Sequence, residues 1–246
     1  MTLAAEEIKA CCATAYSSAA ARFLLGDSFH PGGAALTSRL ARALHVGPGD
    51  LVVDVGCGPG TSAQQLAREA GCAVVGVDLA PPETADDPRV RFLRGDAEAL
   101  PLPDASVDGA LCECALCTFP NKQAAAPELA RVLRPGARLA LSDLTARRDE
   151  LPPSLLSLQA WVACVADARP LGEIAELLAH AGFEIEEAEP HEDALAALVD
   201  RIEARLKVAK FLAAEGAAHA LELVRDVRGA VESGTLGYGV VIARRP

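Results

Sequence analysis

The stretch Leu51–Thr61 reads L-V-V-D-V-G-C-G-P-G-T, an apolar strand that runs into three glycines at alternate positions. Glycine has no Cβ, so Gly56, Gly58 and Gly60 allow a sharp turn and bring bare backbone against a ligand at the head of the next helix. The segment therefore predicts a strand, a turn and a helix that together bind a nucleotide-like cofactor. A tight turn without a ligand is the alternative.

The spacing of these glycines argues against a nicotinamide cofactor. A dinucleotide loop reads G-x-G-x-x-G, whereas Thr61 stands at its third glycine position and an extra glycine lies at Gly60. Asp54 precedes the turn, where a carboxylate repels a pyrophosphate but attracts the ammonium of an amino-acid cofactor. The sequence D-V-G-C-G-P-G resembles motif I of the class I S-adenosylmethionine methyltransferases.

The composition limits which partners and which cellular compartment we expect for this protein. The chain has 246 residues, with 23 Lys and Arg against 34 Asp and Glu and a formal charge of −11, which disfavours nucleic acid. No apolar run reaches the roughly 18 residues of a membrane-spanning helix, so we expect a cytoplasmic protein without membrane partners. Eight cysteines without a secretion signal indicate reduced thiols, some of them functional.

Strands and helices alternate through the middle of the chain, which predicts an α/β fold with a parallel sheet covered by helices. We expect a single domain with an N-terminal helical cap (1–48), a cofactor-binding core (49–190), a helical insertion (191–236) and a last strand (237–246). The cap should contain two helices, at 4–25 and 33–44. Strands are expected at 51–55, 73–78, 90–94, 107–112, 138–143, 183–189 and 238–243.

Ligands of open α/β sheets lie beyond the carboxyl ends of the strands, so the residues at those ends are the candidates for cofactor binding. Asp78 ends the second strand, where a carboxylate can accept hydrogen bonds from both ribose hydroxyls. The third strand continues into R-G-D-A-E-A-L-P, which resembles ubiquinone-biosynthesis-type methyltransferases. In that family the position of Asp96 meets the adenine amino group and the backbone of Ala97 meets the ring edge.

This resemblance covers about residues 50–143, with four motifs in the same order. It implies a Rossmann-like class I methyltransferase sheet, S-adenosylmethionine as the cofactor, and a small acceptor near the end of the fourth strand. Methyl transfer is a near in-line displacement, so the protein mainly holds the reactants at attack distance. The residues expected to bind the cofactor are Asp54, Gly56, Cys57, Gly58, Gly60, Asp78, Leu79, Asp96, Ala97 and Glu113.

Cysteines cluster where the acceptor should bind. Cys112, Cys114 and Cys117 follow one another closely, although cysteine is also common in buried strands. The order C-A-L-C-T-F-P from Cys114, then S-D-L, then W-V-A-C ending at Cys164, resembles the arsenite methyltransferases. In that family the two thiolates at the positions of Cys114 and Cys164 hold trivalent arsenic facing the sulfonium. Soft sulfur ligands suit such a thiophilic acceptor.

The chain departs from the arsenite methyltransferases at two positions. The family's additional cysteine falls at Ala63, and Glu113 replaces what is usually a small amide. Cys117, Cys11 or Cys12 could supply a third sulfur. A zinc site at C-x-C-x-x-C is less favoured, because a second pair of ligands at the customary spacing is missing.

Other acceptors remain open at this point. An oxygen, nitrogen or acidic-carbon acceptor would be helped by a base, for which His30 and Glu113 are the candidates. Tyr16, a scarce aromatic residue, could line the pocket, although core packing is its commoner role. A third hypothesis is a non-catalytic protein that binds the cofactor or a metalloid. The oligomeric state is open.

Overall fold

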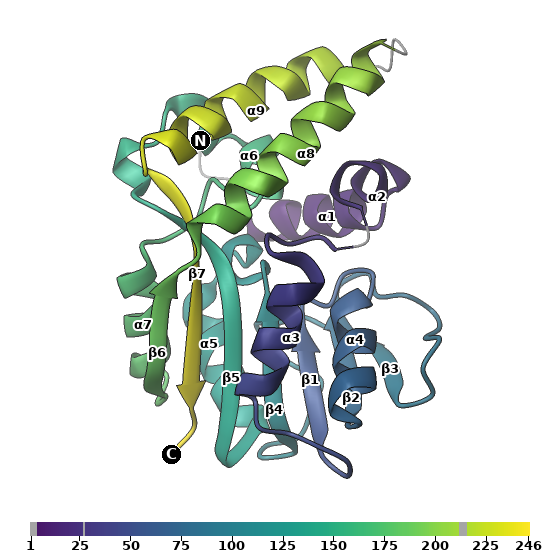
Figure 1. Ribbon diagram of the computed structural model, residues 1–246. Coiled ribbons are helices and arrows are strands. Elements are labelled where there is room, and N and C mark those ends of the chain that lie inside the picture. The colour runs from purple at the N-terminus through teal and green to yellow at the C-terminus, as the bar shows by residue number, and fades with distance from the viewer. Residues whose placement is uncertain (1–3, 27, 212–215) are drawn as a thin grey trace.

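The computed structural model describes residues 4–26, 28–211 and 216–246. Seven strands form one sheet in the order β3-β2-β1-β4-β5-β7-β6, with helices on both faces and more helices above its upper edge (Figure 1). The strands are β1 (Leu51–Val55), β2 (Ala73–Asp78), β3 (Val90–Arg94), β4 (Val107–Glu113), β5 (Leu133–Ala146), β6 (Glu184–Pro190) and β7 (Leu236–Arg244). The predicted α/β class and the predicted strand β1 are confirmed.

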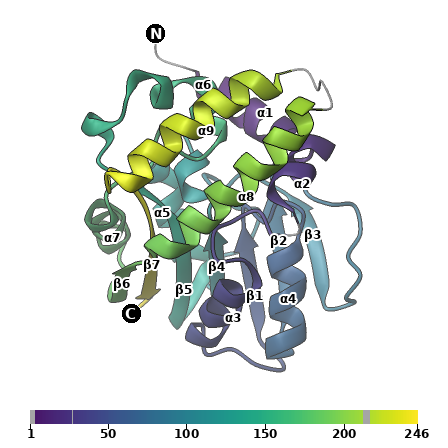
Figure 2. The same ribbon diagram turned by 45° about the horizontal axis from the view of Figure 1, so that its top comes forward.

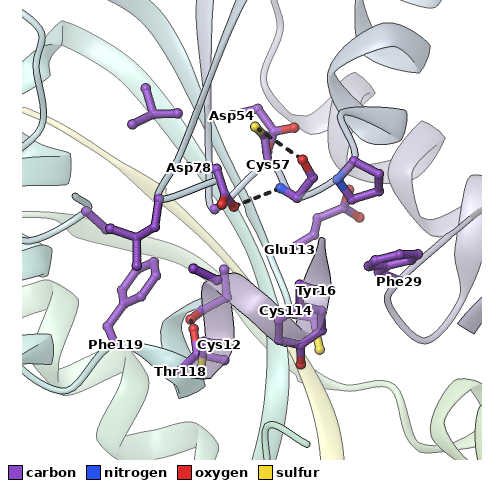
Figure 3. Close-up of a pocket in the computed structure, with 18 of the residues that line it drawn as sticks. Cys12, Tyr16, Phe29, Asp54, Cys57, Asp78, Glu113, Cys114, Thr118 and Phe119 are labelled. Carbon is purple, nitrogen blue, oxygen red and sulfur yellow. Dashed lines mark hydrogen bonds between the residues drawn. The ribbon is translucent and has the colours of Figure 1, made fainter. Parts of the chain in front are cut away.

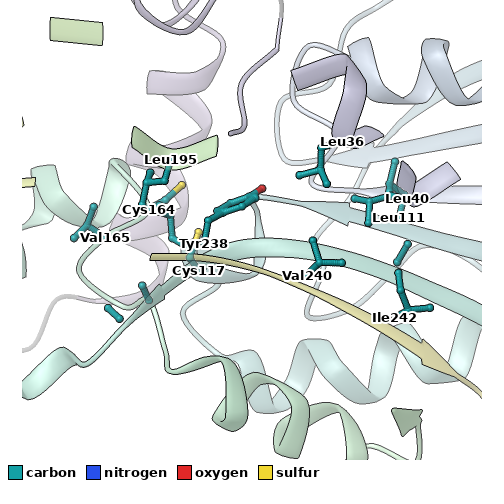
Figure 4. Close-up of a cluster of buried hydrophobic side chains, with 14 of the residues drawn as sticks. Leu36, Leu40, Leu111, Cys117, Cys164, Val165, Leu195, Tyr238, Val240 and Ile242 are labelled. Carbon is teal, nitrogen blue, oxygen red and sulfur yellow. The ribbon is translucent and has the colours of Figure 1, made fainter. Parts of the chain in front are cut away.

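The first five strands pair in parallel, and β1, β2 and β4 are mostly apolar because both of their faces are covered. One face packs against α3 (Gly33–Ala43) and α4 (Thr61–Ala70), and the other against α5 (Lys122–Val132) and α7 (Leu171–His180). Each face therefore has its own hydrophobic core. Figure 4 shows the part of the first core in which Cys117, Cys164 and Tyr238 gather.

The expected parallel sheet is wrong at one edge, where β7 inserts between β5 and β6 and runs antiparallel to both. The cause is the helical insertion that precedes β7. β6 ends at the upper edge of the sheet, where α8 (Glu192–Phe211) and α9 (Ala217–Glu232) lie side by side (Figure 2). These two helices bring the chain back to the same upper edge of the sheet. β7 therefore begins at that edge and runs antiparallel to β5 and β6.

The cap differs from the expected pair of helices. The segment predicted as one helix over 4–25 forms two, α1 (Ala5–Tyr16) and α2 (Ala19–Leu25). The hydroxyl of Ser18 accepts a hydrogen bond from the backbone N–H of Ala21 at 3.1 Å and caps the second helix. Serine competes for backbone hydrogen bonds in this way and favours a break.

The short α6 (Leu158–Val162) and the 3-10 helix η1 (Leu116–Thr118) contact α1, so the cap reaches the upper edge of the sheet. α2 packs against α8, which closes the upper layer. Within the part of the chain described here, no helix has the length and apolarity needed to cross a membrane.

Candidate functional site

A pocket of about 1010 Å³, including its open mouth, lies beyond the carboxyl ends of β1, β2 and β4 (Figure 3). This is the size and the place expected for a ligand site in an α/β sheet. Helix α1 and the segment that follows α2 form its other wall. Of the predicted site residues, those that line the pocket are His30, Asp54, Gly56, Cys57, Gly58, Asp78, Leu79, Asp96, Ala97, Glu113 and Cys114.

The loop after β1 needs its glycines for different reasons. Gly56 has a φ of +73°, and a Cβ there would lie 2.5 Å from the Cβ of Ala115. Gly60 has a φ of +78°, and a Cβ there would lie 2.2 Å from the ring of Phe92. The missing side chain at Gly56 therefore lets the loop pack closely against Ala115 in the pocket wall. Gly60 does not line the pocket; it is the N-cap of α4 and allows the helix to begin.

Asp78 fixes the loop from the end of β2. Its Oδ2 accepts a hydrogen bond from the backbone N–H of Gly58 at 2.9 Å, and its Oδ1 accepts one from Ala80 at 2.9 Å. Each carboxylate oxygen has a second lone pair that can accept another donor. The carboxylate is thus oriented toward the pocket with capacity left for a ligand's hydroxyl groups.

Asp54 lies buried at the base of the pocket. Its Oδ2 is the one buried side-chain oxygen or nitrogen, among the described residues, that has no hydrogen-bond partner. Burial, followed by the negative charges of Glu113 and Asp78, raises the pKa of Asp54 well above its ordinary value. An unpaired buried carboxylate is costly, so this oxygen marks a position that suits a cationic or hydrogen-bond-donating ligand.

Asp96 is held from the cap. Its Oδ2 accepts a hydrogen bond from Nζ of Lys9 at 2.7 Å, and Lys9 also contacts Glu98 at 2.7 Å. The Oδ1 atom accepts from the backbone N–H of Glu98 at 2.9 Å. Helix α1 is therefore tied to the segment after β3 on the pocket's edge.

His30 and Glu113 face each other in a buried polar network beside the pocket. Nε2 of His30 lies 3.6 Å from Oε2 of Glu113, and the hydroxyl of Thr37 donates to both Glu113 oxygens, at 3.2 and 3.1 Å. Nδ1 of His30 lies 3.0 Å from the carbonyl oxygen of Pro31, so this nitrogen carries the proton. Nε2 lies 2.9 Å from the Ser28 hydroxyl, so it accepts a hydrogen bond and is the ring nitrogen that can take up a proton.

Three thiols meet next to the pocket. The Sγ atoms of Cys114, Cys117 and Cys164 all lie within 4.8 Å of one another. Cys114 and Cys117 lie in the stretch that runs from β4 into η1, and Cys164 follows α6, so two segments far apart in the chain supply them. Cys114 lines the pocket wall, while Cys117 and Cys164 lie behind it and are buried. The structure thus brings together the two predicted cysteines and identifies Cys117 as the nearby third sulfur.

The backbone at two of these cysteines is unusual. Four non-glycine residues in the described ranges have a positive φ, and Cys114 (53°) and Cys164 (67°) are two of them. This conformation costs about 1–2 kcal/mol for a residue with a Cβ. Such strain persists only where the surroundings enforce it and gathers at functional sites.

The surroundings of the cluster favour the charged form of one thiol. Hydrogen bonds from Cys114 and Cys117, with further help from Tyr16 and the Lys122 charge, hold the pKa of the Cys164 thiol well below its usual range. Burial and the charge of Cys164 raise the pKa of Asp143 to about 7. Asp143 Oδ2 accepts from the backbone N–H of Cys117 at 2.8 Å and thereby orients η1.

Sequence reasoning missed two features of this site. Cys117 could not be chosen over Cys11 or Cys12, because a sequence gives no distances between segments. Tyr16, for which both core packing and the pocket were considered, does both: it packs against the core and lines the pocket, but its contact with the cluster, 2.9 Å from its hydroxyl to Sγ of Cys164, was not foreseen. Ala63, where a further cysteine was sought, is buried in the core.

The chain is similar to known methyltransferases in sequence. Residues 53–141 match the family model described as "Methyltransferase domain". The chain is 31% identical over 157 residues to an arsenite methyltransferase of Halobacterium salinarum, covering 59% of this chain and 40% of that protein. It is 36% identical over 171 residues to 27-O-demethylrifamycin SV methyltransferase of Amycolatopsis mediterranei, covering 63% of this chain and 61% of that protein.

The fold is also similar to a solved methyltransferase structure. Phosphoethanolamine N-methyltransferase 2 of Haemonchus contortus, in complex with S-adenosyl-L-methionine, superposes with a TM-score of 0.77 at 21% identity over 92% of this chain and 56% of that chain. The chain spans less than two thirds of the length of the two sequence relatives named above. The likeness to the solved structure concerns the fold alone.

Proposed function

Because the chain carries a class I S-adenosylmethionine-dependent methyltransferase domain, we propose that it transfers a methyl group from this cofactor to a small acceptor, with trivalent arsenic as the specific acceptor. The observation that carries the choice of acceptor is the group of three sulfurs beside the pocket. This thiol cluster adjoins the cofactor pocket through Cys114.

The polar groups of the pocket suit the polar groups of S-adenosylmethionine. An ammonium of the methionine part would give the unpaired Oδ2 of Asp54 a partner, and the charges of Glu113 and Asp78 nearby support this assignment. The second lone pair on each carboxylate oxygen of Asp78 suits the ribose hydroxyls. Asp96 and the backbone of Ala97 suit the edge of the adenine ring. Gly56 and Gly58 line the pocket and present no side chain to a cofactor that lies across the loop.

Asp54→Asn is expected to stabilise the cofactor-free protein and to weaken cofactor binding. The neutral amide avoids burying a charge, so we expect a gain of about 1–2 kcal/mol at pH 8, together with an affinity loss of about tenfold or more. Chemical denaturation measures the first effect and calorimetry with S-adenosylmethionine the second. Asp149→Asn, at an exposed position, is the matched control.

The gain in stability of the Asp54→Asn variant should grow as pH rises. The folded protein keeps the Asp54 proton to a higher pH than the unfolded chain, so the wild type loses stability as pH rises from the unfolded pKa, near 3.9, to the raised folded pKa. The advantage of the Asp54→Asn variant is therefore small in acid and complete above that range. A gain that shrinks as pH rises would contradict the assignment.

The three thiols support a soft, trivalent acceptor. Arsenic in this state binds three sulfurs and keeps a lone pair, so Cys114, Cys117 and Cys164 can hold it at the pocket wall. Thiolate ligands are preferred by soft ions, whereas an oxygen or nitrogen substrate has no use for three adjacent thiols. The similarity to the arsenite methyltransferase of Halobacterium salinarum agrees with this choice.

Little acid–base chemistry is then required of the protein. When bound, S-adenosylmethionine supplies a methyl group on a sulfonium sulfur, which departs as S-adenosylhomocysteine in a near in-line displacement. The thiols hold the acceptor so that its lone pair faces the pocket, where Cys114 provides the exposed edge of the cluster. Asp143 and Lys122 keep the cluster's backbone and charge in place.

A second candidate is methyl transfer to an oxygen, nitrogen or acidic carbon of a small metabolite. It is favoured by His30, whose Nε2 can accept a proton beside the pocket. His30→Gln separates the two: removal of a base lowers turnover of such an acceptor by about a hundredfold or more, whereas a lone-pair acceptor needs no base. We expect arsenite methylation in this variant within about threefold of the wild type.

The test measures S-adenosylhomocysteine formation with arsenite and with a metabolite extract, in the wild type and in His30→Gln. Activity with arsenite that survives the substitution supports the thiol acceptor. Activity only with the extract, lost in His30→Gln, replaces it with the second candidate. Cofactor binding without turnover of either would point instead to a binding protein.

A further inference from the structure

The third sulfur of the thiol cluster comes from a different part of the chain than the other two. Cys114 and Cys117 lie in the stretch that runs from β4 into η1, and Cys164 lies in the segment after α6, 50 residues beyond Cys114. The three Sγ atoms nevertheless lie within 4.8 Å of one another, and Figure 4 shows Cys117 and Cys164 together. Contacts between the two segments must therefore hold the third sulfur beside the other two.

Strand β5 fixes the first two cysteines. The backbone N–H of Cys114 donates to the carbonyl oxygen of Ser142 at 2.7 Å, and the backbone N–H of Cys117 donates to Oδ2 of Asp143 at 2.8 Å. Neither hydrogen bond involves the segment of Cys164. The pair formed by Cys114 and Cys117 is therefore positioned independently of the third sulfur.

A buried ion pair joins the segment of Cys164 to that of Cys117. Nζ of Lys122, at the start of α5, donates to Oδ2 of Asp167 at 2.5 Å, and both side chains are only 6% exposed. The same ammonium donates to the carbonyl oxygens of Cys117 at 3.2 Å and of Phe119 at 3.0 Å. One cation thus binds the backbone of one thiol-bearing segment and, three residues after Cys164, a carboxylate of the other.

Asp167 has other partners besides Lys122. Its Oδ1 accepts a hydrogen bond from the guanidinium of Arg169 at 2.9 Å, and NH1 of Arg148 lies 3.8 Å from it. Nε of Arg148 also donates to the carbonyl oxygen of Ala166 at 3.0 Å, which ties the segment to the chain that follows β5. Asp167 therefore keeps a cationic partner when Lys122 is replaced.

We propose that Lys122, held by Asp167, is a positioning residue of the acceptor site: it clamps the segment of Cys164 against that of Cys117 and so fixes the spacing of the three sulfurs. The proposal rests on the proposed function, because the cluster matters as the acceptor site. The backbone of Cys164, with a φ of 67°, has a strained conformation that persists only where the surroundings enforce it. A buried ion pair three residues away supplies such a constraint.

Two arsenic compounds distinguish a site of three sulfurs from a site of two. Arsenous acid, the neutral form of arsenite, forms three As–S bonds, and the three thiol protons leave with its three hydroxyl groups as water. Phenylarsine oxide forms two As–S bonds and releases one water, because a phenyl carbon occupies the third position on arsenic. Arsenite therefore needs Cys164 together with Cys114 and Cys117, whereas the last two suffice for phenylarsine oxide.

We expect Lys122→Met to lower arsenite affinity by about tenfold or more and to leave phenylarsine oxide affinity within about threefold, since loss of groups that orient metal ligands costs about 10–100-fold. Calorimetry with each compound, on cofactor-free protein under a phosphine reductant, measures both affinities. All samples carry Cys11→Ala, so that the adjacent thiols of Cys11 and Cys12 cannot act as a second dithiol site.

Arg169→Gln is the matched control for Lys122→Met. It removes a hydrogen bond to the same Asp167 carboxylate, but Arg169 lies in the segment of Cys164 itself and does not join the two segments. Both affinities should therefore stay within about twofold of the parent protein. Chemical denaturation shows whether each variant is folded.

A second variant answers the question if Lys122→Met folds poorly. Lys122→Met combined with Asp167→Leu removes both charges, and replacement of a buried ion pair by apolar residues is often neutral for folding. It should show the same contrast between the two arsenic compounds. Unchanged arsenite affinity in the folded variants, or an equal loss for both compounds, overturns the proposal.

The outcome is separable from that of the proposed function, because methylation is not part of this measurement. If the variants show the stated contrast but the parent protein forms no methylated arsenic, the proposed function fails and the clamp stands. If the parent protein methylates arsenite but the variants show no contrast, the clamp alone fails. Binding of neither compound to the parent protein would refute both.

Discussion

Replacing any one of Cys114, Cys117 and Cys164 by alanine is expected to lower arsenite affinity by about a hundredfold or more and to remove arsenite methylation. Loss of ligand-supporting groups around a metal already costs about 10–100-fold, and here a ligand itself is removed. The remaining two sulfurs cannot fix the direction of the lone pair. Binding is measured by calorimetry and methylation by the amount of methylated arsenic formed.

The same substitution at Cys72 is the matched control. Cys72 is a buried thiol outside the cluster, so Cys72→Ala should bind and methylate arsenite as the wild type does. Comparison of the three alanine variants also shows which of the sulfurs bind arsenic. Normal binding in Cys117→Ala, with loss in the other two variants, would mean that the third ligand lies elsewhere, and equal activity in all three would refute the thiol site.

Asp78→Ala is expected to weaken S-adenosylmethionine binding by about a hundredfold or more, or roughly 3 kcal/mol. The substitution removes the two carboxylate oxygens that we propose bind the ribose, and it also frees the backbone N–H of Gly58, which donates to Asp78 at 2.9 Å. The loop after β1 then loses its fixed position. Calorimetry with the cofactor measures the loss, and denaturation shows whether the fold persists.

Asp86→Ala provides the comparison for this variant. Asp86 is exposed, lies in the segment between β2 and β3 that follows Asp78, and does not line the pocket. It should bind the cofactor within about twofold of the wild type, since exposed carboxylates contribute little. An equal loss in both variants would indicate a general effect of charge rather than a contact with the ribose.

Local patterns predicted the core of the fold and the cofactor side of the pocket. The strands at Leu51–Val55 and Ala73–Asp78 begin and end where expected, because short apolar runs are bounded by glycine or aspartate. The carboxyl ends of parallel strands meet at one edge, so the sequence alone was enough to place Asp54, Asp78 and Asp96 together. All three line one pocket.

The rest depends on contacts between distant segments. Nothing local to Leu236–Arg244 shows that it runs antiparallel, since its direction follows from how α8 and α9 return the chain. The meeting of Cys117 with Cys164, and of Tyr16 with both, joins segments far apart in the sequence. Periodicity reports which face of an element is buried, and it does not report which other element covers that face.

The most direct test of the central claim is a turnover experiment with isotopically methyl-labelled S-adenosylmethionine, arsenite and a thiol reductant. We expect labelled methylarsenic and S-adenosylhomocysteine to form in equal amounts, and neither to form with the Cys114→Ala variant. Cofactor binding at normal affinity with no labelled arsenic, under conditions in which the wild-type protein is folded and reduced, would contradict the claim that the thiol cluster presents arsenic to the methyl group.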